Sequence, residues 1–441
     1  MMLSQLIQKK YQPTYKAMGW LMIQELIFAI CGLVDITCAN FLSNDAVIAV
    51  TMAVFISNFA LKLRDAFSSA LRVTTARYSG ANDKAAMGGA LTSITILSSA
   101  LTVIIVVVLG FFGRNLLGLF ALSSIQIDLA NSYIMARIPG FLIFGVTNPM
   151  VRSLEAQGNV SKITKIRLVN LLNAPLSLIL MQFWGVMGMG LASSITEAIE
   201  LPAIYFAFKP YYDKPKMKGF KETFALGLTY LPRSLFNSFL NTLSMNLCLK
   251  YLSISSAIIL QLVEKFYGTF SNLIYACTYH VDIALGQAYG TGDNNLTTVE
   301  FENFKHCYLH IWIAHIFIAV IAGFVYFNFI VNVENPMLAV MLLIAWILST
   351  VMWAVAEPLT RVCCVYRVIK PIVMTRVVCL MLFQIPVQII SLKLGTDVFC
   401  IPICYAATDF LWFVVTYRRY RKLPIYHKNE KYDSILQING V

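Results

Sequence analysis

Apolar stretches of about twenty residues, separated by short polar breaks, constrain this chain most strongly. They recur from Met18 to Val415, and roughly 20 apolar residues is the length that an α-helix needs to cross ~30 Å of hydrocarbon. The chain is 58% hydrophobic and only 13% charged, whereas ordinary soluble domains carry about 25% charged residues. This pattern predicts an all-α integral membrane protein and excludes an ordinary soluble fold.

The apolar runs predict about twelve transmembrane helices. They are expected to begin near Ala17, Ala46, Ala85, Asp128, Lys162, Gly188, Glu222, Ser255, Cys307, Pro336, Val373 and Val398. A long polar break divides them into two groups of six. The predicted organisation is an N-terminal segment (1–16), an N-terminal six-helix lobe (17–208), an inter-lobe linker (209–221), a C-terminal six-helix lobe (222–417) and a basic tail (418–441).

Basic residues predict the orientation of these helices. One set of connections is basic and includes Arg77, Lys84, Lys162, Lys165, Arg167, Arg361, Arg367, Lys370, five lysines of the linker and the start of the tail. The opposite connections carry little beyond Arg114, Lys250 and Lys393. The positive-inside rule then places both termini and the linker in the cytoplasm, for a multi-pass protein of the cytoplasmic (inner or plasma) membrane. The formal charge of +12 reflects these basic connections. The sequence has no basic stripe with interleaved aromatic residues, so we do not expect it to bind nucleic acid.

Two short passages repeat one pattern in opposite halves of the chain. Residues 76–83 read Ala-Arg-Tyr-Ser-Gly-Ala-Asn-Asp, and residues 286–293 read Gly-Gln-Ala-Tyr-Gly-Thr-Gly-Asp. Each ends a long apolar segment with an aromatic residue, a glycine turn and an acid, at the cytoplasmic end of the second or eighth span. Because six spans return the chain to its starting side, this placement predicts two parallel repeats related by a pseudo-two-fold axis along the membrane normal, as in many secondary transporters.

These residues resemble the multidrug and toxic compound extrusion (MATE) family, within the multidrug/oligosaccharidyl-lipid/polysaccharide exporter superfamily. Besides the two passages, similar stretches are residues 32–35 (Gly-Leu-Val-Asp), 152–159, 171–176 and 226–228. The resemblance covers nearly the whole chain and is closer in the first half. It implies two six-helix lobes around a central cavity and multidrug efflux driven by inward flow of H+ or Na+, with no other cofactor.

The resemblance also implies roles for particular residues. The first-span acid, Asp35, is expected to be the main ion-coupling group, assisted by Asn173 in the fifth span. One turn after Asn173 the family usually has Asn or Asp, and this chain has Ser177, which we also expect to be an ion-coupling residue. The seventh-span acid of many members falls at Asn237, and the tenth-span acid of some falls near Met352, so this chain lacks two acids that those relatives carry in the C-terminal half.

Three acids inside predicted spans are candidate ion-coupling groups. An ionised carboxylate at the depth of Asp35 costs several kcal/mol unless it is hydrated, paired or protonated, and such groups usually mark ion pathways. Glu197 and Glu200 share a face of the sixth span. Either they form a carboxylate pair in which one member holds a proton, or one is clamped by Arg137. For Asp35, the alternative is a structural hydrogen-bond partner for Asn173 or a neighbouring hydroxyl.

Charged groups in the C-terminal half suggest a substrate cavity. Glu264 and Lys265 lie near the middle of the eighth span, and Arg233 lies in the seventh. One interpretation is that Arg233 and Lys265 attract an anionic or zwitterionic substrate. The other is an internal ion pair between Arg233 and Glu264. Asn237 and Tyr267 complete the set of expected cavity residues.

The leading hypothesis is a secondary active antiporter that exports drugs or small organic ions by alternating access. No GxxxxGK[ST] passage appears, so ATP is not expected to drive it. The alternative is a flippase for a lipid-linked or polyanionic compound, and less favoured is a non-transporting membrane receptor or an enzyme. Ten scattered cysteines form no CxxC pair, and His306 and His310 lack a paired acidic motif, so we expect no metal or catalytic site. The expected partners are a small-molecule substrate and the lipid bilayer, with the protein as a monomer.

Overall fold

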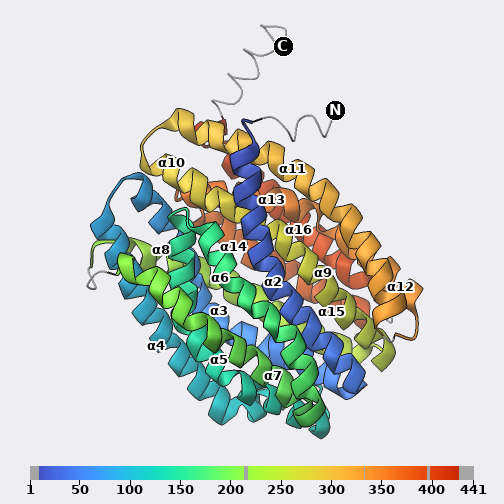
Figure 1. The fold of residues 1–441 in the computed structure, drawn as a ribbon. Coiled ribbons are helices and arrows are strands. Elements are labelled where there is room, and N and C mark those ends of the chain that lie inside the picture. Colours follow the sequence, from blue (N-terminus) through green and yellow to red (C-terminus); the bar gives the residue numbers. More distant parts are fainter. Residues whose placement is uncertain (1–8, 213–216, 332, 395–397, 427–441) are drawn as a thin grey trace.

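The computed structural model describes residues 9–212, 217–331, 333–394 and 398–426. These residues are mostly helical, with short turns between the helices, and include no strand. Parts of three predicted segments lie outside the described residues: the first eight residues of the N-terminal segment, residues 213–216 of the linker, and the tail from residue 427. Both ends of the described chain lie at the same end of the molecule (Figure 1), as an even number of crossings requires.

The first half of the chain forms six membrane crossings, of which the last two share helix α7. In order, the elements are α2 (Gln12–Leu42), α3 (Asn44–Gly80), α4 (Lys84–Leu117), α5 (Ser124–Ala156), α6 (Val160–Arg167), η1 (Leu168–Leu172) and α7 (Asn173–Phe208), followed by η2 (Lys209–Tyr211). The N-termini of α3, α4 and α5 are capped by the side chains of Ser43, Asp83 and Ser123. Such caps satisfy backbone N–H groups that have no partner inside the helix.

The second half repeats this plan with more interruptions. Its elements are α8 (Met217–Tyr251), α9 (Ile254–His280), η3 (Val281–Leu285), α10 (Gly286–Gly290), α11 (Asn294–Val325), η4 (Tyr326–Ile330), α12 (Pro336–Ser349), α13 (Val351–Val365), α14 (Lys370–Cys379), η5 (Leu380–Gln384), α15 (Ile385–Lys393) and α16 (Cys400–Tyr420). Several are consecutive pieces of one membrane crossing. Thus α12 with α13, and α14 with η5 and α15, each form a single long stretch.

A sharp turn at Gly185 divides α7 into two antiparallel crossings. Gly185 has φ 53° and ψ −134°, a backbone conformation that glycine adopts without the steric cost of a Cβ. The hydrogen bond from Asn170 to Glu200, at 2.8 Å, shows the reversal, because thirty residues of straight helix would separate them by about 45 Å. The fifth and sixth predicted spans are therefore a helical hairpin.

This hairpin brings the described residues to twelve crossings. Nine stretches are long and apolar enough to span a membrane by length and composition, and one of them, Val160–Tyr211, contains both arms of the hairpin. The other two crossings are α8 and α9, which are long enough but more polar. The predicted starts agree with the structure except at the ninth span, where α11 begins at Asn294 and not near Cys307. That prediction was wrong because the first three turns of α11 are polar, and hydropathy detects only where the apolar part begins.

The two lobes meet along two equivalent pairs of helices. Helix α2 packs along α9, and α3 packs along α8. Since α2 and α3 open the first lobe as α8 and α9 open the second, each pair joins the first helix of one lobe to the second helix of the other. This exchange is what a two-fold relation between the lobes produces.

The two repeated passages interlock at this interface. A Cβ built on Gly80 would lie 2.0 Å from the carbonyl oxygen of Gln287, and one built on Gly290 would lie 2.2 Å from that of Arg77. Glycine therefore allows the two backbones to touch. Asp83, at the end of the first passage, accepts hydrogen bonds from the backbone of Ala86 and from Lys218, and these contacts lower the pKa of its carboxyl.

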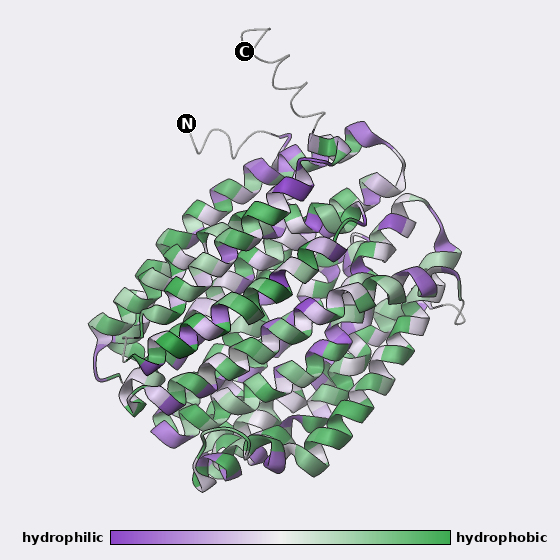
Figure 2. Ribbon diagram, turned by 180° about the vertical axis from the view of Figure 1, so that it is seen from behind, coloured by the Kyte–Doolittle hydropathy of each residue, from purple (hydrophilic) through white to green (hydrophobic). Residues whose placement is uncertain are grey.

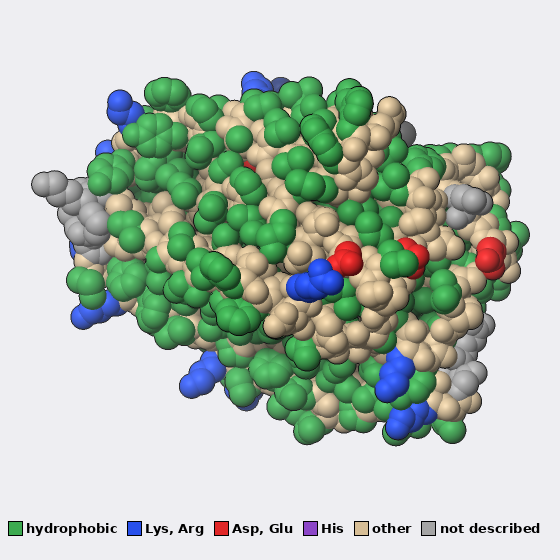
Figure 3. Space-filling view, turned by 90° about the horizontal axis from the view of Figure 1, so that it is seen from below, with side chains coloured by type: hydrophobic (Ala, Val, Ile, Leu, Met, Phe, Trp, Pro, Cys, Tyr) green, Lys and Arg blue, Asp and Glu red, His purple; other side chains and the backbone are tan. Residues whose placement is uncertain are grey.

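Apolar side chains cover the outside of the helices. Phe111 and Leu382, for example, are 80% and 76% exposed, as expected for residues that face lipid. Hydrophilic residues gather at the end of the molecule that carries both termini (Figure 2). Seen from below, the opposite end shows few charged side chains among many hydrophobic ones (Figure 3).

Candidate functional site

A central cavity of about 320 Å³ lies between the two lobes. The first lobe contributes residues from α2, α3, α5, η1 and α7, and the second lobe contributes residues from α9. Its charged lining residues are Asp35, Arg137, Glu197, Glu264 and Lys265. Five of the ten residues expected at the site line it: Asp35, Asn173, Glu197, Glu264 and Lys265.

Asp35 is held by neutral hydroxyl groups. Its carboxylate accepts hydrogen bonds from the phenol of Tyr133, at 2.7 Å, and from Ser177, at 3.2 Å. Ser177 lies 3.5 Å from the amide oxygen of Asn173, whose nitrogen donates to Ser193 at 2.7 Å. Ser177 thus joins the two residues that the family resemblance selects, and Tyr133 is a partner that sequence reasoning missed.

Glu197 and Glu200 each face an arginine. Arg137 approaches Glu197 at 3.2 Å, while Glu200 contacts Arg167 at 3.4 Å and accepts a hydrogen bond from Asn170. This arrangement agrees with the clamp by Arg137. Each of the two carboxyl groups thus has its own cationic partner.

On the opposite wall, Lys265 reaches from α9 to the backbone of α2. A Cβ on Gly32 would lie 3.3 Å from Cε and 3.4 Å from Nζ of Lys265, so the ammonium group lies beside α2 one turn before Asp35. Lys265 and Glu264 form no ion pair with any other described residue. Both are therefore available to the cavity.

Arg233 is not part of this wall. It pairs with Glu357 of α13, and its guanidinium lies 5.0 Å from the ring centroid of Trp412. The expected pair between Arg233 and Glu264 is not formed among the described residues, and Arg233 does not line the central cavity. Helix α8 turns this side chain toward α13, which sequence spacing alone does not reveal.

A second cavity of about 310 Å³ lies inside the C-terminal lobe. Asn237 and Tyr267 line it, together with an ion pair between Arg376 and Asp409. Glu264 lines both cavities, so its carboxyl group stands in the wall between them. The C-terminal lobe thus places two acids on this cavity, Glu264, which the sequence analysis expected, and Asp409, which it did not.

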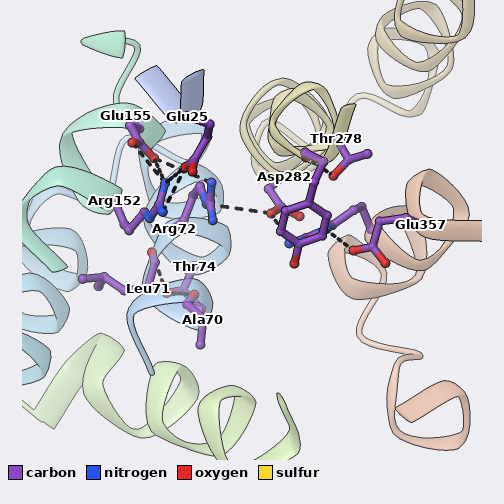
Figure 4. Close-up of polar contacts among 12 residues, drawn as sticks. Glu25, Ala70, Leu71, Arg72, Thr74, Arg152, Glu155, Thr278, Asp282 and Glu357 are labelled. Atoms are coloured by element: carbon purple, nitrogen blue, oxygen red, sulfur yellow. Dashed lines mark hydrogen bonds and ion pairs between the residues drawn. The ribbon is translucent and has the colours of Figure 1, made fainter. Parts of the chain in front are cut away.

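A buried ladder of alternating charges connects the lobes on the side of the repeated passages (Figure 4). In the first lobe, Arg152 contacts Glu25 and Glu155, both at 3.2 Å, and Glu155 contacts Arg72 at 3.6 Å. Arg72 then reaches Asp282 of the second lobe at 3.9 Å. The ladder therefore crosses the lobe interface through the pair of Arg72 and Asp282.

The ladder continues inside the second lobe. Arg361 binds Asp282 at 2.8 Å and Glu357 at 3.0 Å, and Glu357 also pairs with Arg233. The ring of Tyr279 lies 3.5 Å from the guanidinium of Arg72 and 5.3 Å from that of Arg361, within the range of cation–π attraction. Sequence reasoning missed this ladder because its members come one or two at a time from separate helices.

No group of three or more His, Cys, Asp or Glu side chains in the described part of the chain could hold a metal ion. His306 stacks on Tyr11 at 4.2 Å, and His310 hydrogen-bonds Tyr15 at 2.6 Å. The histidine pair therefore packs against the start of α2.

Comparisons with known proteins agree on the fold. The MatE family model matches residues 21–179. Among solved structures, a MATE transporter in the straight conformation has a TM-score of 0.76 at 14% identity, covering 93% of this chain and 95% of its own. A mutant of the Vibrio cholerae MATE transporter VcmN gives 0.75 at 14%, covering 95% of this chain and 100% of its own.

A MOP superfamily transporter from Pyrococcus furiosus, whose binding pocket is described as having reverse polarity, gives a TM-score of 0.73 at 16% identity, with coverage of 92% and 95%. No curated protein matches the chain at a significant level. Residues 21–179 are therefore similar to the MatE family, and the chain has, over nearly its whole length, the two-lobed fold of these MATE transporter structures.

Proposed function

We propose that this protein is a secondary active exporter that moves a small organic molecule by alternating access of its two lobes, with H+ or Na+ flowing inward. The observation that carries the proposal is the environment of Asp35. This buried carboxylate faces a cavity between the lobes, and its hydrogen-bond partners are hydroxyl groups, whereas Glu197 and Glu200 are each matched by an arginine. Asp35 is therefore the N-lobe acid of the cavity best placed to exchange a cation.

The physical chemistry of a buried carboxylate supports this coupling. In a low-dielectric site an ionised acid needs a counter-charge, and a bound cation or an added proton supplies it. The cation is gained or lost only when the cavity is open to water. Binding at Asp35 can thus follow which side of the membrane the cavity faces.

The remaining topology follows from the same proposal. We place both termini and the linker in the cytoplasm and divide the lobes at residues 17–208 and 222–417. The basic connections support this orientation. Contacts between the lobes lie within one chain, so we infer that a monomer transports.

The test is transport into everted membrane vesicles that contain the full chain. Compounds are first selected by a growth-resistance screen, and their uptake is then followed under opposed H+ and Na+ gradients. Uptake should collapse when the driving gradient is dissipated and should be lost in Asp35→Asn. Asp45→Asn, a half-buried acid at the start of α3 that does not line the central cavity, serves as the control. Uptake that persists without either gradient, or full activity of Asp35→Asn, would contradict the proposal.

One observation favours the flippase as a second candidate. Lys265 places a positive charge in the central cavity, which suits a phosphate-bearing headgroup. A fluorescent phospholipid or lipid-linked sugar in proteoliposomes distinguishes the two functions, because a flippase exposes it to an aqueous quencher without a requirement for Asp35.

A further inference from the structure

Both walls of the central cavity carry charged side chains. The wall from α9 presents Glu264, Lys265 and Gln261, and because Gln261 and Lys265 are four residues apart they share a helix face. The wall from the first lobe presents the carboxylates of Asp35 and Glu197, with Arg137 paired to Glu197. Lys265 and Asp35 are thus groups of opposite charge on the two sides of the lobe interface.

Several polar atoms on these walls lack a protein partner. Gln261 is only 1% exposed, yet neither atom of its amide makes a hydrogen bond. One oxygen of Glu197, Oε2, is also buried without a donor. A buried polar group without a partner costs about 1–3 kcal/mol, so both walls favour a ligand that supplies the missing contacts.

We propose that this cavity binds a small zwitterion. Its carboxylate or other anionic group contacts the Lys265 ammonium and the Gln261 amide, and its ammonium group contacts the carboxylates of Asp35 and Glu197. The inference deepens the proposed export function by naming the class of substrate. A cavity of about 320 Å³ is at the small end of ligand pockets, which suits an amino acid or a betaine.

Coupling by direct competition favours a zwitterion over a simple anion. A proton on Asp35 neutralises the carboxylate that the ligand ammonium needs, so ligand and proton exclude one another, as antiport requires. A simple anion on Lys265 would instead be favoured by a proton on Asp35, and the two would travel together. A simple cation would leave the Lys265 ammonium and Gln261 without partners.

Binding to the purified full-length protein tests this inference. Common amino acids and betaines are screened at millimolar concentration by thermal shift, and affinities of the hits are measured by calorimetry. Each hit is compared with its decarboxylated amine and its deaminated acid, as phenylalanine is compared with phenethylamine and hydrocinnamate. We expect the zwitterion to bind at least about tenfold more tightly than either analogue, which corresponds to about 1.4 kcal/mol.

Variants then assign the two ends of the ligand. Lys265→Met should abolish the preference for the zwitterion over the amine, and because it removes a positive charge it should not weaken amine binding. Lys265→Arg should retain most of the preference. Lys393→Met, at the exposed end of α15, is the control. Asp35→Asn should weaken the zwitterion and the amine but not the acid.

The inference is overturned if no zwitterion of the panel binds, if the amine binds as tightly as its zwitterion, or if Lys265→Met leaves their ratio unchanged. Its failure is distinguishable from failure of the export proposal. Gradient-driven uptake of a cation without any zwitterion preference would refute the inference alone, whereas zwitterion binding without gradient-driven uptake would refute export alone.

Discussion

Gly80→Ala should open the side of the molecule where the repeated passages interlock. The new methyl carbon would lie 2.0 Å from the carbonyl oxygen of Gln287, whereas ordinary van der Waals contact begins at 3.4 Å, so the two backbones must separate by about 1.4 Å. Because the obstacle is backbone, no change of rotamer relieves it. Overpacking of this kind costs about 1–3 kcal/mol, which lowers the population of the closed conformation about 5–150-fold.

Distance measurements between two spin labels report this shift. Lys84→Cys and Asn294→Cys place the labels at equivalent, exposed positions after the two passages. In Gly80→Ala the long-distance population should rise strongly relative to the otherwise unchanged protein. Gly19→Ala is the matched control, since a Cβ there meets nothing within 4 Å. Identical distance distributions in the two variants would refute the interlocking role of Gly80.

Three further predictions follow from other contacts. Asp282→Asn breaks a buried ion pair and should reduce stability by about 3–5 kcal/mol, visible as a lower unfolding temperature. Glu25→Gln, at the more exposed end of the ladder, should reduce stability clearly less. Equal losses of stability would contradict the ladder's central role. Ser177→Ala removes one hydrogen bond to Asp35, worth about 1 kcal/mol, and should slow ion-coupled uptake about fivefold. The control Ser132→Ala, at an exposed hydroxyl, should leave the uptake rate unchanged. Equal uptake rates in the two variants would refute the role of Ser177. Asp83→Ala should reduce stability by about 1 kcal/mol through loss of the α4 cap. Because hydrogen bonds lower the pKa of Asp83, the ionised cap stabilises the fold at neutral pH, and this stabilisation is lost below about pH 4. The difference in stability between the unchanged protein and Asp83→Asn should therefore vary with pH only in acid, and a difference that stays constant would contradict this.

Much of the fold could be predicted because the helix residues that face lipid must be apolar, so the hydropathy of the sequence marks each membrane crossing. The repeated passages also predicted the relation between the lobes, although not that the passages contact one another. The start of α11 could not be found in the same way, because its polar turns continue a helix beyond the apolar segment. Nor does hydropathy identify the hairpin at Gly185 as a tight turn between two crossings.

The candidate site was predicted less completely. Resemblance selected Asp35 and Asn173, and the structure places both on the central cavity, but Tyr133 and Gln261 carried no recognisable motif. Pairing of buried charges depends on how each helix is rotated about its axis, which the sequence does not reveal. Arg233 therefore pairs with Glu357 and not with Glu264.

The charge ladder has a consequence for the electrical behaviour of transport. It contains four carboxylates, Glu25, Glu155, Asp282 and Glu357, and four arginines, Arg72, Arg152, Arg233 and Arg361. When the lobes part, two charged members of each sign stay with each lobe, so each half of the ladder carries no net charge. A membrane potential, which acts with about 2.3 kcal/mol per unit charge per 100 mV, therefore does no work on the ladder as the lobes move. The charges carried in the central cavity, by contrast, are ones on which the potential can act.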